Sequence, residues 1–347
     1  MSEMNRQTLL DRYQSLSLAF SVGIQNLAYD SNNLHPLLCL ILGNDDRTRD
    51  VAQRTDKCLE NVHRTNPNWL NRRVDTILRD PDFNNVSAAL GEIRAYGELI
   101  WVWDRKISTP QSGADFCLKL PDCVVEIEVH TPQHRTERHD RIIEEHQSSN
   151  VMTTMTELFP FGWPERCNID TVQGEAVSRL AQVKDCEYQF TKENISVLWL
   201  DLQDPKLWPL DFSTAQLLPV SCFGENLTSG ALWNALYGER GLEVYDELSV
   251  LGTPPRYYKM EFNGRFNSKS SIDFCIVDTR MVQTAFENHH KSYTIPPTFY
   301  RGLYNLFKFN LETSWIDWPN TGTLQARVNE AINTIRLHKD AFRITLL

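Results

Sequence analysis

The sequence lacks the motifs that identify several common enzyme classes. It contains no Gly-x-x-x-x-Gly-Lys-Ser/Thr loop, no Gly-x-Gly-x-x-Gly fingerprint and no Gly-x-Ser-x-Gly elbow. The first two of these turns cradle phosphates with backbone N–H groups, and the third presents a serine nucleophile. P-loop nucleotide hydrolysis, dinucleotide-dependent hydride transfer and serine-hydrolase chemistry therefore have no support in this chain.

Paired cysteine motifs are also missing. The eight cysteines are scattered with no Cys-x-x-Cys spacing, and several lie in apolar segments; they occupy positions 39, 58, 117, 123, 167, 186, 222 and 275. A zinc knuckle or a disulfide framework would need closer and more regular spacing. We expect the cysteines to be reduced core residues.

Long apolar runs are absent as well. No stretch approaches the roughly 20 residues that cross a bilayer, and the first residues lack the basic-then-apolar layout of a signal peptide. We therefore expect a cytoplasmic protein without a membrane partner. The net charge of −10 argues against coating nucleic acid with the whole surface, because phosphate binding relies on Lys and Arg. Any nucleic-acid contact should be local.

The patterns that are present predict an α/β protein of two parts. Apolar residues recur with helical spacing from residue 6 to about 80, which predicts an N-terminal helical region over 1–80. We expect an α/β domain over 81–347, a mixed β-sheet flanked by helices. Within it the sequence predicts a core at 83–202, an insertion at about 131–170 and a C-terminal extension at 205–347.

The predicted core has a recognisable order of elements. A helix is expected around Val86–Leu99, with caps in the Asp80–Asn85 stretch, and a strand at Ile100–Ile107. A hairpin follows, then a helix over roughly Val172–Phe190. The nearly continuous apolar run Ile195–Leu202 predicts a strand that is buried on both faces.

The hairpin carries the most informative residues. Two short strands meet at Pro121-Asp122, and along the second strand Glu126, Glu128 and His130 should share one face. With that turn, paired residue numbers sum to 243, which places Asp115 opposite Glu128 and diagonal to Glu126. Like charges across a ladder are destabilising, so a cation between them is expected. Oxygen ligands favour Mg²⁺ or Mn²⁺.

The order of elements, together with Glu92, Gly113-Ala-Asp115 and Val125-Glu126-Ile-Glu128, resembles the PD-(D/E)XK nuclease superfamily, which has the restriction-endonuclease-like fold. The resemblance covers residues 83–202. It implies that Glu92, Asp115, Glu126 and Glu128 surround the metal, with Asp115, Glu126 and Glu128 as ligands. The nominal proline before the aspartate is absent.

The lysine of the family motif is replaced in this chain. Glu128 stands at that position, as in a Glu-x-Glu variant of the motif. A shift along the strand instead makes Glu128 the ligand and puts His130 in the place of the lysine. Lys184, on the following helix, is a third candidate for that role. The residues leave all three alternatives open.

The resemblance implies a Mg²⁺- or Mn²⁺-dependent endonuclease that hydrolyses DNA phosphodiester bonds, in bacterial restriction or phage defence. Metal chemistry would activate a water and neutralise charge on the phosphate. Duplex DNA is the expected partner, and a homodimer is expected because cutting both strands normally needs two sites. RNA is a further substrate to test. The alternative is a catalytically inactive protein that uses the fold as a scaffold for nucleic acid or protein.

Two groups of arginines flank the acidic residues along the chain. Arg135, Arg138 and Arg141 follow the hairpin, and we expect them to contact nucleic acid. The other group comes before the core helix and consists of Arg72, Arg73 and Arg79. A basic rim around an acidic centre would follow if either group lies beside the hairpin, although solvated surface charges explain both groups equally well.

Overall fold

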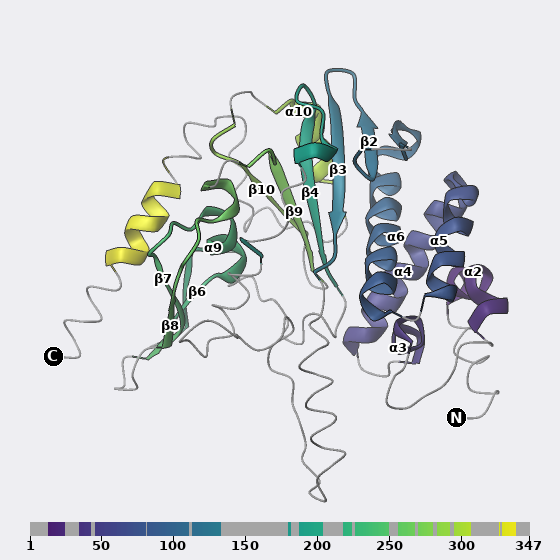
Figure 1. Cartoon of the computed structure of the whole chain (residues 1–347), viewed down its shortest axis with the longest axis horizontal. Helices are drawn as coiled ribbons and strands as arrows, with labels where there is room; N and C mark the ends of the chain where they lie inside the picture. Colours follow the sequence, from purple (N-terminus) through teal and green to yellow (C-terminus); the bar gives the residue numbers. More distant parts are fainter. Residues whose placement is uncertain are drawn as a thin grey trace, which may run out of the picture.

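The computed structural model of the chain is a mixed α/β structure with a six-stranded mixed sheet flanked by helices (Figure 1). The structure describes residues 13–24, 35–42, 46–80, 82–110, 113–132, 180–181, 187–203, 218–223, 226–249, 256–267, 270–279, 283–291, 295–306, 326 and 328–337.

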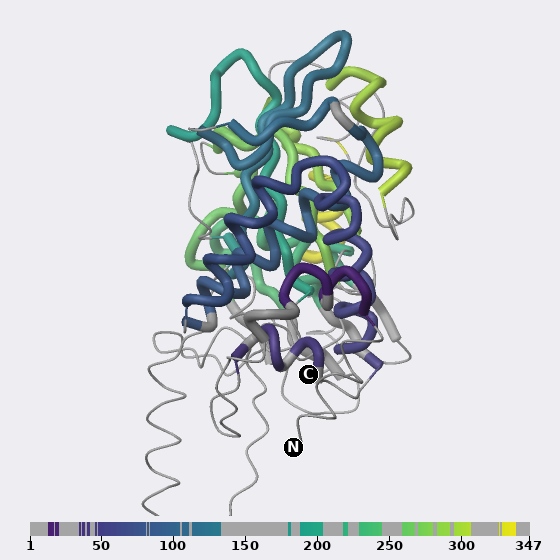
Figure 2. The backbone as a smooth tube through the Cα atoms, turned by 90° about the vertical axis from the view of Figure 1, so that its right-hand side faces the viewer, coloured from purple at the N-terminus to yellow at the C-terminus, as the bar shows by residue number. Residues whose placement is uncertain are grey.

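The N-terminal region is helical, as its periodicity predicts. It contains α2 (Gln14–Ile24), α3 (Pro36–Leu42), α4 (Asp46–Thr65) and α5 (Pro67–Arg79). Their buried apolar side chains belong to one cluster with those of the next helix and one face of the main sheet. The helices therefore pack directly on the sheet domain, and Figure 2 shows them in front of the sheet.

The core helix α6 runs from Phe83 to Trp103. The Asp82 carboxylate caps its start by accepting a hydrogen bond from Asn85 N at 2.9 Å, which confirms the predicted capping stretch. The prediction of a strand at Ile100–Ile107 was wrong. The helix continues because Leu99, Ile100 and Trp103 still lie on its buried face; the adjacent strand β1 is only Ile107–Ser108.

The main sheet has the strand order β1-β2-β3-β4-β9-β10. The strands β1, β2 and β3 form an antiparallel meander, β3, β4 and β9 are parallel, and β10 is antiparallel to β9. Their bounds are Phe116–Lys119 for β2, Val124–His130 for β3, Ile195–Leu202 for β4, Phe274–Thr279 for β9 and Gln283–Glu287 for β10.

The predicted register of the acidic hairpin is confirmed. Phe116 pairs with Ile127 and Cys117 with Glu126, so the paired numbers sum to 243. Val125 and Ile127 are buried in the core, and Glu126 and Glu128 lie on the opposite face. The turn and the alternation together are enough to place Asp115 beside Glu128.

Strand β4 lies at the centre of the sheet and is buried on both faces, as predicted. Val197 and Trp199 pack with α6 on one side. Leu198 and Leu200 pack on the other side with α9 (Ala231–Tyr237) and a C-terminal helix at 328–337. Two apolar cores therefore cover the two faces of one sheet.

A second, four-stranded antiparallel sheet lies beyond α9 in Figure 1. Its strands are β5 (Val220–Phe223), β6 (Asn226–Ser229), β7 (Glu243–Ser249) and β8 (Arg256–Lys259). The helix α10 (Pro297–Leu303) packs on the first core.

Two helices approach each other very closely at one glycine. A Cβ on Gly97 of α6 would lie 2.5 Å from the Cys58 Cα of α4. Backbone cannot yield as a flexible side chain can, so this crossing requires glycine. In addition, Asn61 Nδ2 donates a hydrogen bond to Gly97 O at 3.2 Å, which fixes α4 against the core helix.

The prediction that the cysteines lie in the core is confirmed for Cys58 and Cys275, which are buried, whereas Cys117 and Cys123 are partly exposed. Cys58, Cys117, Cys123 and Cys275 carry free thiols. Within the described ranges, none of the helices combines the length and the apolar character needed to cross a bilayer.

Candidate active site

Three carboxylates from three elements gather beside the hairpin. Asp115 directly precedes β2, Glu128 lies opposite on β3, and Glu92 comes from α6. Asp115 Oδ2 accepts a hydrogen bond from Val129 N at 2.9 Å, which anchors this carboxylate to the neighbouring strand. We call Glu92, Asp115 and Glu128 the acidic cluster.

Burial and mutual repulsion make the acidic cluster unusually hard to ionise. Burial, followed by the charge of Asp115, raises the pKa of Glu92 to about 8 and that of Glu128 to about 7. Burial also raises the pKa of Asp115, although the Val129 hydrogen bond opposes that shift. The cluster therefore holds protons at neutral pH unless another cation replaces them.

The Asp115 and Glu128 carboxyl groups are within hydrogen-bonding contact of each other. Two ionised carboxylates have no donor between them, so the contact requires a shared proton or a cation. Gln189 Nε2 donates a hydrogen bond to Glu128 Oε1 at 2.7 Å. The backbone N–H of Asp115 also lies within hydrogen-bonding reach of the Glu128 carboxylate, and its other oxygen, Oε2, is buried with no well-aligned donor among the described residues. It is thus available to a cation.

Glu126 does not join the acidic cluster, although it shares a strand face with Glu128. Its carboxylate accepts hydrogen bonds from Thr191 N at 2.6 Å, Thr191 Oγ1 at 2.8 Å and Asn194 Nδ2 at 3.0 Å. These bonds hold the turn that precedes β4. The geometry thus pairs Asp115 with Glu128 rather than with Glu126.

The remaining predicted site residues fall into two groups. His130 is the last residue of β3, two positions beyond Glu128 on the same face. Lys184, Arg135, Arg138 and Arg141 lie outside the described residues.

Arg73 of α5 brings a positive charge to the acidic cluster. It forms an ion pair with Glu92, and its side chain is 33% exposed. Arg73 lowers the pKa of Glu92, but burial and Asp115 outweigh it. The sequence suggests a basic rim that includes this arginine but does not indicate the ion pair. The sequence signal for this ion pair was the pair of adjacent arginines on the amphipathic helix that directly precedes the helix of Glu92.

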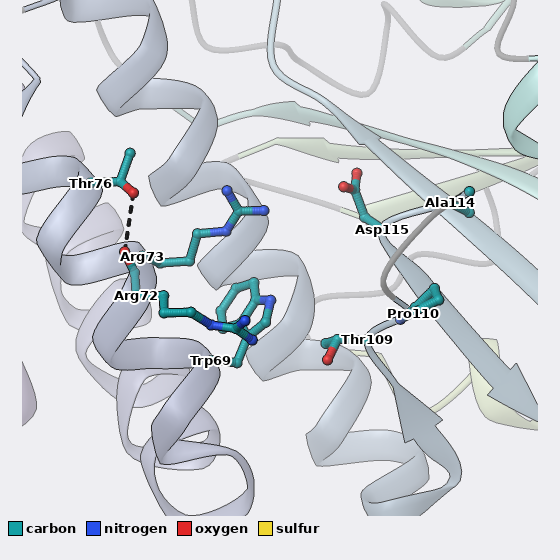
Figure 3. A pocket seen from close by; sticks show the side chains of 9 residues that line it. Trp69, Arg72, Arg73, Thr76, Thr109, Pro110, Ala114 and Asp115 are labelled. Atoms are coloured by element: carbon teal, nitrogen blue, oxygen red, sulfur yellow. Dashed lines mark hydrogen bonds between the residues drawn. The ribbon is translucent and has the colours of Figure 1, made fainter.

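A cavity of about 640 Å³ opens beside Asp115 (Figure 3). Its walls come from α5 on one side and from residues 109–110 and 113–115 on the other. Arg73 and Asp115 extend toward each other from opposite walls in Figure 3. The lining residues are Trp69, Arg72, Arg73, Thr76, Thr109, Pro110, Gly113, Ala114 and Asp115.

The donor set of the acidic cluster is suited to a hard divalent cation but is not a complete cage. Carboxylate oxygens are the ligands that Mg²⁺ and Mn²⁺ prefer, and Mg²⁺ commonly takes one or two carboxylates and keeps several waters. No group of three or more His, Cys, Asp or Glu side chains that could hold a metal ion is found among the described residues. Among the described residues, Asp115 and Glu128 are in contact with each other and could share a cation, with waters completing its coordination.

A second group of charged residues is fully buried, and the sequence did not predict it. Arg54 of α4 donates to Glu98 Oε1 at 2.8 Å and to Asp278 Oδ2 at 3.1 Å. Arg94 of α6 forms an ion pair with Asp201 at the end of β4. We call these five residues the buried ion network. Its sequence signal was weak: charged residues interrupting otherwise apolar segments.

Comparison of the chain with protein-family models, with curated proteins and with solved structures finds no match. The resemblance to the nuclease superfamily therefore depends on the residues and element order alone. Within the core these are Glu92 on α6, Asp115 before β2, and Glu128 on β3.

Proposed function

We propose that the chain is a metal-dependent endonuclease that hydrolyses DNA phosphodiester bonds at Asp115 and Glu128. The observation that carries this proposal is the contact between their two carboxyl groups, with Glu128 Oε2 buried and without a well-aligned donor among the described residues. Crowded carboxylates with raised pKa values cost stability, and a functional role is the usual reason for retaining them.

The metal would be held by Asp115 and Glu128, and when bound it would lower the pKa of a water and neutralise charge on the phosphate. The protein orients both ligands. Val129 N holds Asp115 by one oxygen, and Gln189 holds Glu128 by Oε1. Such hydrogen bonds to ligating groups fix their rotamers before substrate arrives.

Two further side chains have the chemistry to handle protons. His130 lies two residues after Glu128 on β3, where it takes the lysine's position in the motif and would orient the attacking water. Glu92 pairs with Arg73, and burial together with the charge of Asp115 raises its pKa to about 8, so it can exchange a proton near neutral pH. Asp115, Glu128 and His130 thus form the reactive set, with Glu92 behind it.

The test is nicking of supercoiled plasmid DNA in Mg²⁺ or Mn²⁺. Asp115→Asn and Glu128→Gln should each lower the cleavage rate by about 10²-fold or more, since each removes a ligand charge that acts in the transition state. The matched control is Glu60→Gln, which neutralises an exposed acid on α4. Cleavage by the wild-type protein in the presence of a chelator would refute the proposal. Cleavage by Asp115→Asn at the wild-type rate would refute it as well.

A second candidate is a catalytically inactive protein that binds nucleic acid or another protein through this fold. This candidate is favoured because two of the acids already have protein partners. Glu92 forms an ion pair with Arg73, and Glu126 accepts hydrogen bonds from Thr191 and Asn194. Such a protein would bind its partner equally well with and without metal. The nicking assay separates the two candidates.

A further inference from the structure

The cavity beside the acidic cluster has the charge pattern of an anion site. Arg72 and Arg73 project into it from α5, and Asp115 lies at its edge (Figure 3). Arg72 is exposed, and Arg73, which pairs with Glu92 and lies over the Trp69 ring, is 33% exposed. Guanidinium groups are suited to phosphate because their planar donors match two phosphate oxygens.

A neighbouring cavity of about 700 Å³ extends the same surface. The two cavities share Thr109, and the second contains Arg64 from the last turn of α4. It also contains the acid Asp104, so its wall is not uniformly basic. Arg64, Arg72 and Arg73 thus lie along one path that leads to Asp115.

The size of these cavities favours one strand over a duplex. Volumes of 640 and 700 Å³ fall within the roughly 300–1,000 Å³ typical of small-molecule pockets. A few nucleotides of a single strand fit that space, whereas the two backbones of a duplex need a broad open surface. Trp69 is buried and packs edge-on against Tyr96, so it offers no face for base stacking and the contacts are left to phosphates.

We propose that these two cavities bind the phosphate backbone of a single DNA strand, with Arg72 and Arg73 as phosphate contacts that deliver the strand to Asp115. This inference rests on the proposed nuclease function for its choice of ligand. It assigns the N-terminal helices α4 and α5 a role in substrate binding. A local basic path explains how a chain of net charge −10 can bind a polyanion.

The experiment is fluorescence anisotropy with a labelled single-stranded DNA oligonucleotide in chelator, so that binding is measured without cleavage. Arg72→Gln/Arg73→Gln should bind about ten-fold more weakly than wild type. Its slope of log affinity against log salt should be shallower by roughly 1.4, because each arginine that neutralises a phosphate of a single strand accounts for about 0.7 of that slope. Arg240→Gln, an exposed arginine between α9 and β7, is the matched control and should bind like wild type.

Two further measurements test whether the loss of binding comes from a lost ion pair and whether the site prefers a single strand. Arg73→Gln removes an ion pair, so Arg72→Gln alone, which leaves that pair intact, should still weaken binding several-fold. A duplex of the same sequence should bind more weakly than the single strand. Unchanged affinity in both arginine variants, or equal loss for single strand and duplex, would overturn the inference.

The outcomes also separate this inference from the proposed function. Asp115→Asn should abolish cleavage but leave strand binding in chelator intact or tighter, because it removes a negative charge from the cavity wall. If the protein nicks DNA but its affinity for the single strand does not change when Arg72 and Arg73 are replaced, the nuclease proposal stands and the binding path is rejected. Arginine-dependent binding without Mg²⁺- or Mn²⁺-dependent cleavage of either the plasmid or the single-stranded oligonucleotide would reject the nuclease and leave the binding path.

Discussion

The buried ion network and the acidic cluster each gather three carboxylates, yet their charges are balanced differently. In the buried ion network, two arginines compensate Glu98, Asp201 and Asp278, and all five side chains are nearly inaccessible. In the acidic cluster, Arg73 alone compensates three acids, beside a cavity. The buried ion network therefore lacks one positive charge, and burial raises the pKa of Asp278 to about 7, so a proton can supply it. The acidic cluster lacks two positive charges, which leaves more negative charge for a cation to balance.

The largest expected effect comes from removing a cation of the buried ion network. Arg54→Met should lower the free energy of unfolding by about 3–5 kcal/mol, because it leaves Glu98 and Asp278 buried without their partner. Chemical denaturation measures the loss. Arg73→Met is the matched variant in the acidic cluster; its side chain is one-third exposed, so we expect a loss below about 1 kcal/mol. Equal losses would mean that the two regions do not differ as described.

A smaller effect should appear in the pH dependence of stability. The pKa of Glu92 is raised from 4.5 to about 8 and that of Glu128 from 4.5 to about 7. The folded protein therefore binds these protons more tightly than the unfolded chain, and the free energy of unfolding should fall as pH rises through this window. After allowance for solvent screening, we expect a fall on the order of 1–3 kcal/mol in chelator.

The measurement is urea denaturation at a series of pH values across that window. The control is Glu92→Gln/Glu128→Gln, in which the fall should be smaller and should come from the remaining acids with raised pKa values, Asp278 among them. Adding Mn²⁺ should stabilise the wild type most at the alkaline end, where the acids are ionised. A wild-type profile identical to that of the double variant would show that the acids do not interact.

The smallest expected effect tests the register of the motif. Glu126→Gln should cost about 0.5–1.5 kcal/mol of stability, because it weakens the charge-assisted hydrogen bonds to Thr191 and Asn194. Its cleavage rate should stay within a few-fold of wild type, while Glu128→Gln loses about 10²-fold or more. Plasmid nicking compares the two variants directly. The opposite ranking would restore Glu126 as the metal ligand.

Part of the fold was predictable because its determinants are local. The turn at Pro121-Asp122 and the alternation of Val125, Glu126 and Ile127 set the hairpin register. The apolar run of β4 predicted burial on both faces. The strand prediction at Ile100–Ile107 failed because β-branched and aromatic residues also suit a buried helix end, and only packing against the core decides between them.

The candidate site also has a part that the sequence predicted and a part that it did not. That Asp115 lies near Glu128 follows from strand geometry, and the structure agrees. That Glu126 is engaged elsewhere depends on the turn at Thr191 and Asn194, which lies more than 60 residues along the chain. The nuclease resemblance itself remains a prediction that the experiments above address.

The sequence by itself determined the alternating hairpin, the capped core helix and the doubly buried strand, because each follows from the spacing of neighbouring residues. Only the tertiary structure decided that Arg73 reaches Glu92, that Arg54 and Arg94 neutralise the distant Asp278 and Asp201, and that Arg72 shares a cavity with Asp115. These pairings join residues far apart in the chain. Their energies depend on burial and distance, which the order of residues does not specify.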